Sequence, residues 1–168
     1  MYKLIVVSDN HSEPGVLYDI YDKHDDADAY FHLGDSEFEY NDTELSLYKR
    51  VKGNMDFYPE FPESKIEQYG DIKVFITHGH LYGVNASREN LAQQATNQHA
   101  QFAFYGHTHI ARYEHIHNVH LINPGSISKS RSHIEETYCE VKIENKSAII
   151  NFRNRQHEII KSIRIDVI

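Results

Sequence analysis

The sequence predicts a mixed α/β fold in one domain over residues 1–168, and three observations support this prediction. The length fits one hydrophobic core. The first two-thirds of the chain alternate short apolar runs with helical or polar segments, which is typical of βα units. From Arg112 onward the pattern changes to alternating strands joined by short turns, which predicts antiparallel hairpins.

Short apolar runs rich in β-branched and aromatic residues predict the strands of the first part. The predicted strands, with their flanking turns, lie at 3–7, 29–33, 47–54, 64–80 and 101–106. The segment 64–80 is a hairpin turned at Gly70-Asp71, with 73–77 as its buried strand.

Two segments predict helices. Residues 13–24 place apolar side chains at helical spacing, at Val16, Leu17, Ile20 and Tyr21. The second helix begins at Ser87, which can cap it with Asn90 as a weak third-position partner, and runs to about Gln98. The polar segment 36–46 between two strands predicts a loop or a short helix.

Hairpin patterns fill the last third of the chain, at 112–123, 137–152 and 157–168. In the last segment apolar and polar residues alternate, which predicts a half-buried strand with Ile163, Ile165 and Val167 on one face. The histidines of the first hairpin are expected at the surface: His115, His117 and His120.

Composition narrows the classes of function. The formal net charge is −8 without a basic patch, which argues against a nucleic-acid-binding module. No apolar run is long enough for a membrane span, and the first residues do not resemble a signal peptide, so a cytoplasmic location is expected. The single cysteine, Cys139, rules out an internal disulfide and a zinc site built of several thiolates.

Polar residues follow five successive predicted strands. They are Asp9 and His11, Gly34-Asp35, Gly53-Asn54, His78-Gly79-His80, and Gly106-His107-Thr108-His109. Each set alone is typical of an ordinary turn or surface position. In open α/β sheets, however, sites form beyond the carboxyl ends of the strands, where several loops converge. Five such sets in succession therefore predict a site, and their Asp, Asn and His side chains indicate a metal.

This ordered set of D-x-H, G-D, G-N, H and G-H-x-H resembles the motif of the metallophosphoesterase superfamily, also called calcineurin-like phosphoesterases. The resemblance spans Leu4 to His109. It continues in residues 122–126, "INPGS", which are similar to a segment of the small bacterial and archaeal phosphodiesterases of that family. The fold that it implies is a four-layer α/β/β/α sandwich, with two mixed β-sheets face to face and helices outside.

The resemblance also implies two divalent metal ions. One would be bound by Asp9, His11, Asp35 and His109, and the other by Asp35, Asn54, His78 and His107, so that Asp35 bridges them. Mixed oxygen and nitrogen ligands suit Mn²⁺, Fe²⁺, Zn²⁺ or Ni²⁺ better than Mg²⁺ or Ca²⁺, and the resemblance favours Mn²⁺. Two such ions with two carboxylates leave a local charge of about +2, which attracts anions.

The implied activity is hydrolysis of a small phosphodiester, in which a hydroxide bridging the two metals attacks phosphorus in line. A phosphomonoesterase or a nuclease would use the same site, although the acidic segment 35–44 argues against long nucleic acids. Alternatives of other classes are a metal-storage or metal-sensing protein and a non-catalytic scaffold. The retromer sorting subunit, for example, resembles this fold but lacks part of the site, whereas all seven ligand positions are filled here. The sequence leaves the oligomeric state open between a monomer and a homo-oligomer.

One position departs from the family pattern. Many members carry a histidine after the asparagine, thought to help the leaving group depart, and here that position is Met55. A thioether offers no proton. The nearest polar candidate for this catalytic role is His80, two residues after the predicted ligand His78, with an ordinary rim histidine as the alternative.

Overall fold

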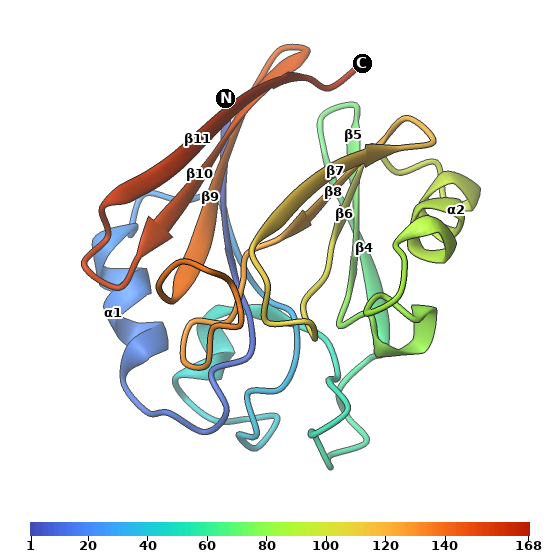
Figure 1. Ribbon diagram of the computed structural model, residues 1–168. Coiled ribbons are helices and arrows are strands. Elements are labelled where there is room, and N and C mark those ends of the chain that lie inside the picture. The colour runs from blue at the N-terminus through green and yellow to red at the C-terminus, as the bar shows by residue number, and fades with distance from the viewer.

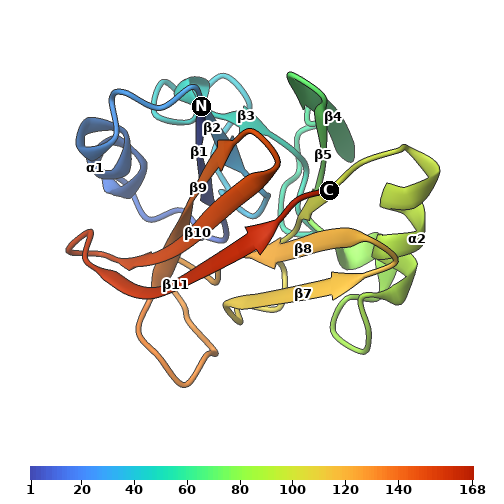
Figure 2. The ribbon, with the colours of Figure 1, turned by 90° about the horizontal axis from the view of Figure 1, so that it is seen from above.

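Two β-sheets pack face to face in the computed structural model, which describes all residues 1–168 (Figure 1). The first sheet has six strands in the order β11-β10-β9-β1-β2-β3, and the second has five in the order β4-β5-β6-β8-β7. Seen from above, helices α1 and α2 lie on opposite sides of the paired sheets (Figure 2). The four-layer sandwich implied by the sequence is therefore confirmed. No helix has the length and apolar character needed to cross a bilayer.

The elements follow one another along the chain in this order: β1 (Tyr2–Val7), α1 (Val16–Lys23), β2 (Ala29–His32), η1 (Leu45–Leu47), β3 (Lys49–Arg50), β4 (Ser64–Tyr69), β5 (Ile72–Thr77), η2 (His80–Tyr82), α2 (Glu89–Asn97), β6 (Phe102–Phe104), β7 (Arg112–Ile116), β8 (Val119–Asn123), β9 (Thr137–Glu144), β10 (Ser147–Asn154) and β11 (Ile159–Asp166). Here η1 and η2 are single turns of 3₁₀ helix.

The three cores follow from the alternation of side chains along each strand. In β1, Leu4 and Val6 face the core between the two sheets, whereas Ile5 and Val7 face the core beneath α1. In β5, Phe75 belongs to the core beneath α2, and its neighbours along the strand face the other sheet. Because β1 and β5 are covered on both faces, their sequences are nearly continuous apolar runs.

Both predicted helices are present, and α1 confirms its apolar spacing, but their boundaries differ from those predicted. In α1, Val16, Leu17 and Ile20 are buried. Helix α2 begins one residue later than a cap at Ser87 would give, although the Ser87 hydroxyl accepts the Glu89 N–H at 3.2 Å. Arg88 stands at the cap position because its guanidinium pairs with a carboxylate of β7 at 2.7 Å.

The predicted hairpins are present. Gly70 and Asp71 form the two-residue turn between β4 and β5, and His117 and Asn118 turn β7 into β8. Both residues of the second turn have positive φ, which is the geometry of a type I′ hairpin. In β11 the predicted apolar face packs toward the core between the sheets.

The expected surface position of His120 is wrong. This side chain is only 2% exposed, because β8 lies between β6 and β7 and is covered on both faces. The Tyr113 hydroxyl donates to His120 Nδ1 at 2.8 Å, and the His115 ring stacks on it at 4.4 Å. Burial lowers the pKa of His120.

Strand direction decides where the site forms. Strands β1, β2 and β3 are parallel to one another, and so are β5, β6 and β8. The loops that follow these strands meet at one end of the sandwich, the lower end in Figure 1. All five predicted polar sets lie in these loops.

Candidate metal centre

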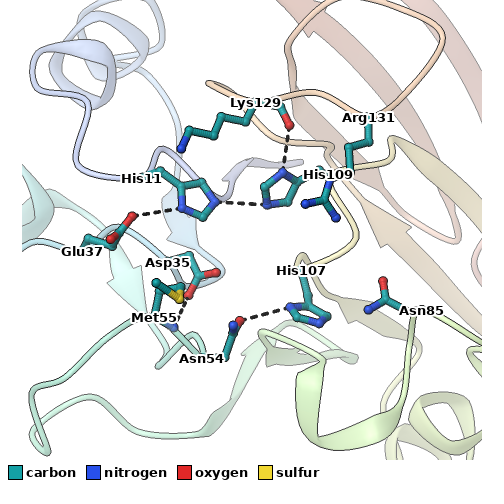
Figure 3. Close-up of a pocket in the computed structure, with 10 residues that line it drawn as sticks. All are labelled: His11, Asp35, Glu37, Asn54, Met55, Asn85, His107, His109, Lys129 and Arg131. Carbon is teal, nitrogen blue, oxygen red and sulfur yellow. Dashed lines mark hydrogen bonds and ion pairs between the residues drawn. The ribbon is translucent and has the colours of Figure 1, made fainter.

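The seven predicted ligands come together where the parallel strands end. Two groups of side chains each hold their ligand atoms within 4.8 Å of one another. The first group is Asp9, His11 and His109, and the second is Asp35, His78 and His107. Asn54 lies beside the second group (Figure 3).

In the first group the two imidazoles point at each other. His11 Nε2 and His109 Nε2 lie 3.0 Å apart. Asp9 Oδ1 lies 3.7 Å from His11 Nε2 and 3.5 Å from His109 Nε2. Three ligand atoms, two from the loop after β1 and one from the loop after β6, thus surround one small volume.

In the second group the Asn54 amide oxygen faces two rings. Asn54 Oδ1 lies 3.0 Å from His78 Nε2 and 3.1 Å from His107 Nδ1. Asp35 Oδ2 lies 3.2 Å from His78 Nε2. The two groups are adjacent, because Asp9 Oδ1 also lies 3.8 Å from His78 Nε2.

One atom tests whether these residues fit a metal. Asp9 Oδ1 is buried and accepts no hydrogen bond, whereas Asp9 Oδ2 accepts from the Ser8 hydroxyl at 2.5 Å and from the His107 N–H at 3.2 Å. A buried carboxylate oxygen without a partner is strongly unfavourable. This oxygen faces imidazole nitrogens of both groups, so a divalent cation would satisfy it and them together. The oxygen and nitrogen donors fit Mn²⁺, Fe²⁺, Zn²⁺ or Ni²⁺.

Three of the histidines are held in the tautomer that metal binding needs. In each ring Nδ1 donates its hydrogen to an oxygen that can only accept, which leaves the Nε2 lone pair free to face the site. The pairs are His11 with Glu37 Oε2 at 3.0 Å, His78 with the Leu33 carbonyl at 2.7 Å, and His109 with the Lys129 carbonyl at 2.8 Å.

The carboxylates give the site a field that attracts cations. Burial alone would raise the pKa of Asp9, but the charge of His78 and the hydrogen bond from Ser8 lower it to about 2. Burial alone would lower the pKa of His78, but Asp9 and Asp35 raise it to about 9. In the metal-free protein His78 therefore carries a proton that a bound metal ion would have to displace.

Five of the seven predicted ligands have a left-handed backbone. Their φ angles are 59° at Asp9, 45° at His11, 58° at Asp35, 72° at His107 and 62° at His109. This region is uncommon for residues other than glycine, and such conformations cluster at functional sites. The loops turn sharply here, so that consecutive strand ends aim side chains at one point.

Asp56 organises two of these loops, and no pattern in the sequence points to it. Its Oδ2 accepts the N–H groups of Asp35 at 2.9 Å and Gly53 at 2.7 Å. Its Oδ1 accepts the N–H of Glu37 at 3.0 Å. Asp56 therefore positions the loops that carry Asp35 and Asn54 without contacting the site itself.

The segment 122–126 supports the loop after β6. Asn123 Nδ2 donates to the Gly106 carbonyl at 3.1 Å and to the Thr108 hydroxyl at 2.9 Å. The Ser126 hydroxyl donates to the Asp9 carbonyl at 2.7 Å. The likeness of "INPGS" to the family segment thus corresponds to a positioning role.

His32 positions the loops after β1 and β2. Its Nδ1 accepts the Gly34 N–H at 3.1 Å, so Nε2 carries the hydrogen and donates to Asn10 Oδ1 at 2.8 Å. Burial lowers the pKa of His32 to about 4, which keeps the ring neutral and this pattern intact.

Two glycines are required because the backbone approaches the ligands closely. A Cβ on Gly53 would lie 2.0 Å from Asp35 Oδ1. A Cβ on Gly106 would lie 2.2 Å from Ser8 Oγ and 2.7 Å from Asp9 Oδ2. No side chain fits at either position without moving a ligand.

A pocket of about 380 Å³ opens over the two groups (Figure 3). Lys129 and Arg131 line it on the side of His11 and His109, and Asn85 lies near His107. The remaining lining residues include Glu37 and Met55, the latter being the one apolar side chain. The pocket thus combines a metal-binding floor with cationic side chains, which suits an anionic ligand.

His80 lies outside the lining of this pocket. Its ring centre lies 5.4 Å from that of His78 and 6.0 Å from that of His107. Its Nδ1 is buried without a hydrogen-bond partner, and burial lowers the pKa of the ring. His80 therefore adjoins the second group but makes no polar contact with it.

Comparison with known proteins identifies a family and several similar structures. Residues 2–146 match the model of the calcineurin-like phosphoesterase superfamily domain. The chain is 33% identical over 162 residues to the probable metallophosphoesterase YsnB of Bacillus subtilis, covering 96% of each chain. The crystal structure of a predicted phosphoesterase from Streptococcus pneumoniae superimposes with a TM-score of 0.93 at 33% identity, over 98% of this chain and 97% of that one. Vps29 of Entamoeba histolytica complexed with Zn²⁺ shares the fold, with a TM-score of 0.77 at 20% identity over 99% of both chains.

Proposed function

The chain belongs to the calcineurin-like phosphoesterase superfamily, and from this premise we propose that it hydrolyses a small phosphodiester with two divalent metal ions. The observation that carries the proposal is the buried, unpartnered Asp9 Oδ1, which faces imidazole nitrogens of both ligand groups. A scaffold that binds no metal has no need for such an oxygen.

We assign one ion to Asp9, His11, Asp35 and His109, and the other to Asp35, Asn54, His78 and His107. Bound there, two divalent ions would act as Lewis acids that activate water and withdraw charge from the phosphoryl oxygens. Mn²⁺ is the proposed metal, with Fe²⁺, Zn²⁺ and Ni²⁺ as alternatives suited to the same donors.

The chain's own residues bind and orient the ester. Lys129 and Arg131 line the pocket and attract the phosphoryl oxygens of an incoming anion. Glu37 holds the His11 ring in place rather than contacting substrate. These positions would hold the phosphorus against the floor of the pocket while the ester groups extend outward.

The proton for the leaving group is assigned to His80. Met55 lines the pocket at the position where a donor would otherwise stand, and its thioether has no proton to give. His80 Nδ1 is buried and the ring stands outside the pocket lining, so the proton would reach the substrate from Nε2 through a connecting water.

A second candidate is a phosphomonoesterase. Two cations, Lys129 and Arg131, would suit a dianionic monoester as well as a diester. We favour the diester because a second pocket adjoins the first at Arg131, which gives room for the second ester group.

The test is a screen of metals against substrates. The purified protein is stripped with a chelator, reloaded with each of the four ions and assayed on bis(p-nitrophenyl) phosphate and p-nitrophenyl phosphate. We expect two bound ions per chain and the highest kcat/KM for the diester with Mn²⁺. Asp9→Asn should abolish activity, whereas Asp71→Asn, which removes the same charge from an exposed turn, should not. Tight binding of two ions with no hydrolysis of either ester would contradict the enzymatic proposal.

A further inference from the structure

A second pocket of about 370 Å³ adjoins the metal centre. Its lining is Ile110, Ala111, Arg112, Arg131, Ser132, His133, Ile134, Phe152 and Lys161. Arg131 lines both pockets, so the two adjoin at this side chain.

The second pocket lies between the free edges of the two sheets. Arg112 begins β7, the edge strand of one sheet, and Lys161 lies in β11, the edge strand of the other. Lys161 pairs across the strands with Phe152, so both side chains stand on the same face. Phe152 belongs to the core between the sheets, and the lysine therefore stands at the mouth of the pocket.

The charge of this region is unusual for the molecule. The net charge is −8, yet no acidic side chain lines the second pocket. The lysines and arginines that form ion pairs all lie elsewhere. The unpaired cations run from the first pocket into the second: Lys129, Arg131, Arg112 and Lys161.

The wall between the pockets is fixed to the metal centre. The Arg131 N–H donates to the His109 carbonyl at 2.8 Å, and the Ala111 N–H donates to the Ser132 hydroxyl at 2.8 Å. Arg112 follows His109 by three residues, a distance of at most about 10 Å along the chain. The backbone positions of His109 and Arg112 are therefore close enough for one small substrate to contact both pockets.

Four of the nine lining residues of the second pocket are apolar, namely Ile110, Ala111, Ile134 and Phe152, and Ser132 and His133 add polar groups. Ile134 is 45% exposed, so a large apolar surface remains available to a ligand. An apolar wall beside a cationic rim fits a planar or sugar-like group that carries an anion at its far end.

We propose that this second pocket binds a further phosphate of the substrate, and that the preferred substrate is a small diester in which one ester alcohol is a phosphorylated nucleoside or a similar group. The inference rests on the proposed function, since the first pocket must hold the phosphorus that reacts. Arg112 and Lys161 determine specificity and take no part in the reaction itself.

The test uses two esters with the same leaving group. One is the p-nitrophenyl ester of thymidine 5′-phosphate, and the other is the same molecule phosphorylated at its 3′-hydroxyl. We expect kcat/KM to be about tenfold or more higher for the 3′-phosphorylated ester, mainly through KM, which corresponds to one charge-assisted hydrogen bond. In the double variant Arg112→Gln, Lys161→Gln this ratio should fall to about one. Lys146→Gln, at the far turn between β9 and β10, removes a matched charge and should keep the wild-type ratio.

The outcomes separate the inference from the proposed function. Equal rates for the two esters, or a ratio that survives in the double variant, would overturn the inference while leaving the phosphodiesterase in place. If neither ester is hydrolysed with any metal, the proposed function fails. Calorimetry with thymidine 3′,5′-bisphosphate and thymidine 5′-phosphate then tests whether the second pocket binds a phosphate. Tighter binding of the bisphosphate that is lost in the double variant would sustain it. Tighter binding of a long oligonucleotide than of the bisphosphate would overturn the small-molecule assignment.

Discussion

Replacing Asp56 by asparagine removes one charge and almost no volume. The side chain is 5% exposed and accepts three backbone N–H groups, from Asp35, Gly53 and Glu37. The asparagine oxygen can keep two of these bonds, but its amide group cannot accept the third. Asp56→Asn is therefore a test of whether these bonds position the loops.

The expected loss follows from the bonds themselves. A hydrogen bond to a charged group contributes about 1.5–3 kcal/mol, against about 1 kcal/mol for a neutral one, so the two retained bonds weaken by about 1 kcal/mol each. The N–H of Glu37 loses its acceptor, which costs about 1–3 kcal/mol. We expect Asp56→Asn to lower the free energy of unfolding by about 3–5 kcal/mol. Metal affinity should fall by about 10- to 100-fold, as for other residues that orient ligands.

Urea unfolding of the metal-free protein measures the first effect, and competition with a chromogenic chelator measures the second. Asp71→Asn is the matched control, because it removes an exposed carboxylate from the turn between β4 and β5. The reasoning is refuted if Asp56→Asn unfolds within about 1 kcal/mol of wild type and binds both ions with unchanged affinity, since the asparagine would then replace the carboxylate fully.

Further predictions concern the metal centre directly. Asp35→Asn should weaken binding of both ions, because one carboxylate serves both; an unchanged load of two metals per chain would argue against bridging. His107→Ala and His109→Ala should each deplete a different ion by about tenfold or more in affinity, and intact occupancy of both sites in both variants would show that the assignment is wrong. Met55 offers no proton and the donor role is assigned to His80, so wild-type rates should fall only moderately as leaving-group pKa rises. His80→Gln should then slow alkyl diesters far more than nitrophenyl diesters, by up to about 10²–10⁴-fold, and equal slowing would remove its acid role. Asp9 and Asp35 raise the pKa of His78 to about 9, so a metal must displace a proton below that pH and its apparent affinity should rise with pH up to about 9. Calorimetry in two buffers of different ionisation enthalpy counts that proton, and no release at pH 7.5 would contradict the raised pKa.

Local patterns in the sequence predict the strands that carry the site and the ligand residues at their ends. β1 and β5 are short apolar runs that end directly before polar side chains, and both the period and the break are visible within a few residues. The turns at Gly70-Asp71 and His117-Asn118 are equally local. Turns of this kind can be predicted because all the residues that form them are consecutive in the sequence.

What escaped prediction depends on partners far apart in the chain. Asp56 bonds to the N–H of Asp35, 21 residues earlier, and Ser126 bonds to the carbonyl of Asp9, 117 residues earlier. In the sequence His120 resembles a surface residue of an exposed hairpin. In the structure β6 pairs with β8, and His120 is buried. Hydrophobic periodicity does not indicate which strands pair with each other. The supporting residues and the central position of β8 could therefore be identified only from the structure.

The predicted ligands satisfy two requirements at once, one of backbone geometry and one of metal chemistry. This explains why their motifs are easy to identify in the sequence. Each loop must turn sharply just after a strand end, and five of the seven predicted ligands lie within five residues of one and have positive φ. Apart from glycine, Asp, Asn and His are the residues most enriched in that conformation, and they are also the ligands that a divalent transition metal binds. A left-handed β-branched or bulky apolar residue would add strain and supply no donor atom. At Asp9 and His109, therefore, backbone geometry and metal chemistry select the same few residue types. The glycines at 53 and 106 complete the turns because any Cβ there would meet a ligand or its hydrogen-bond partner.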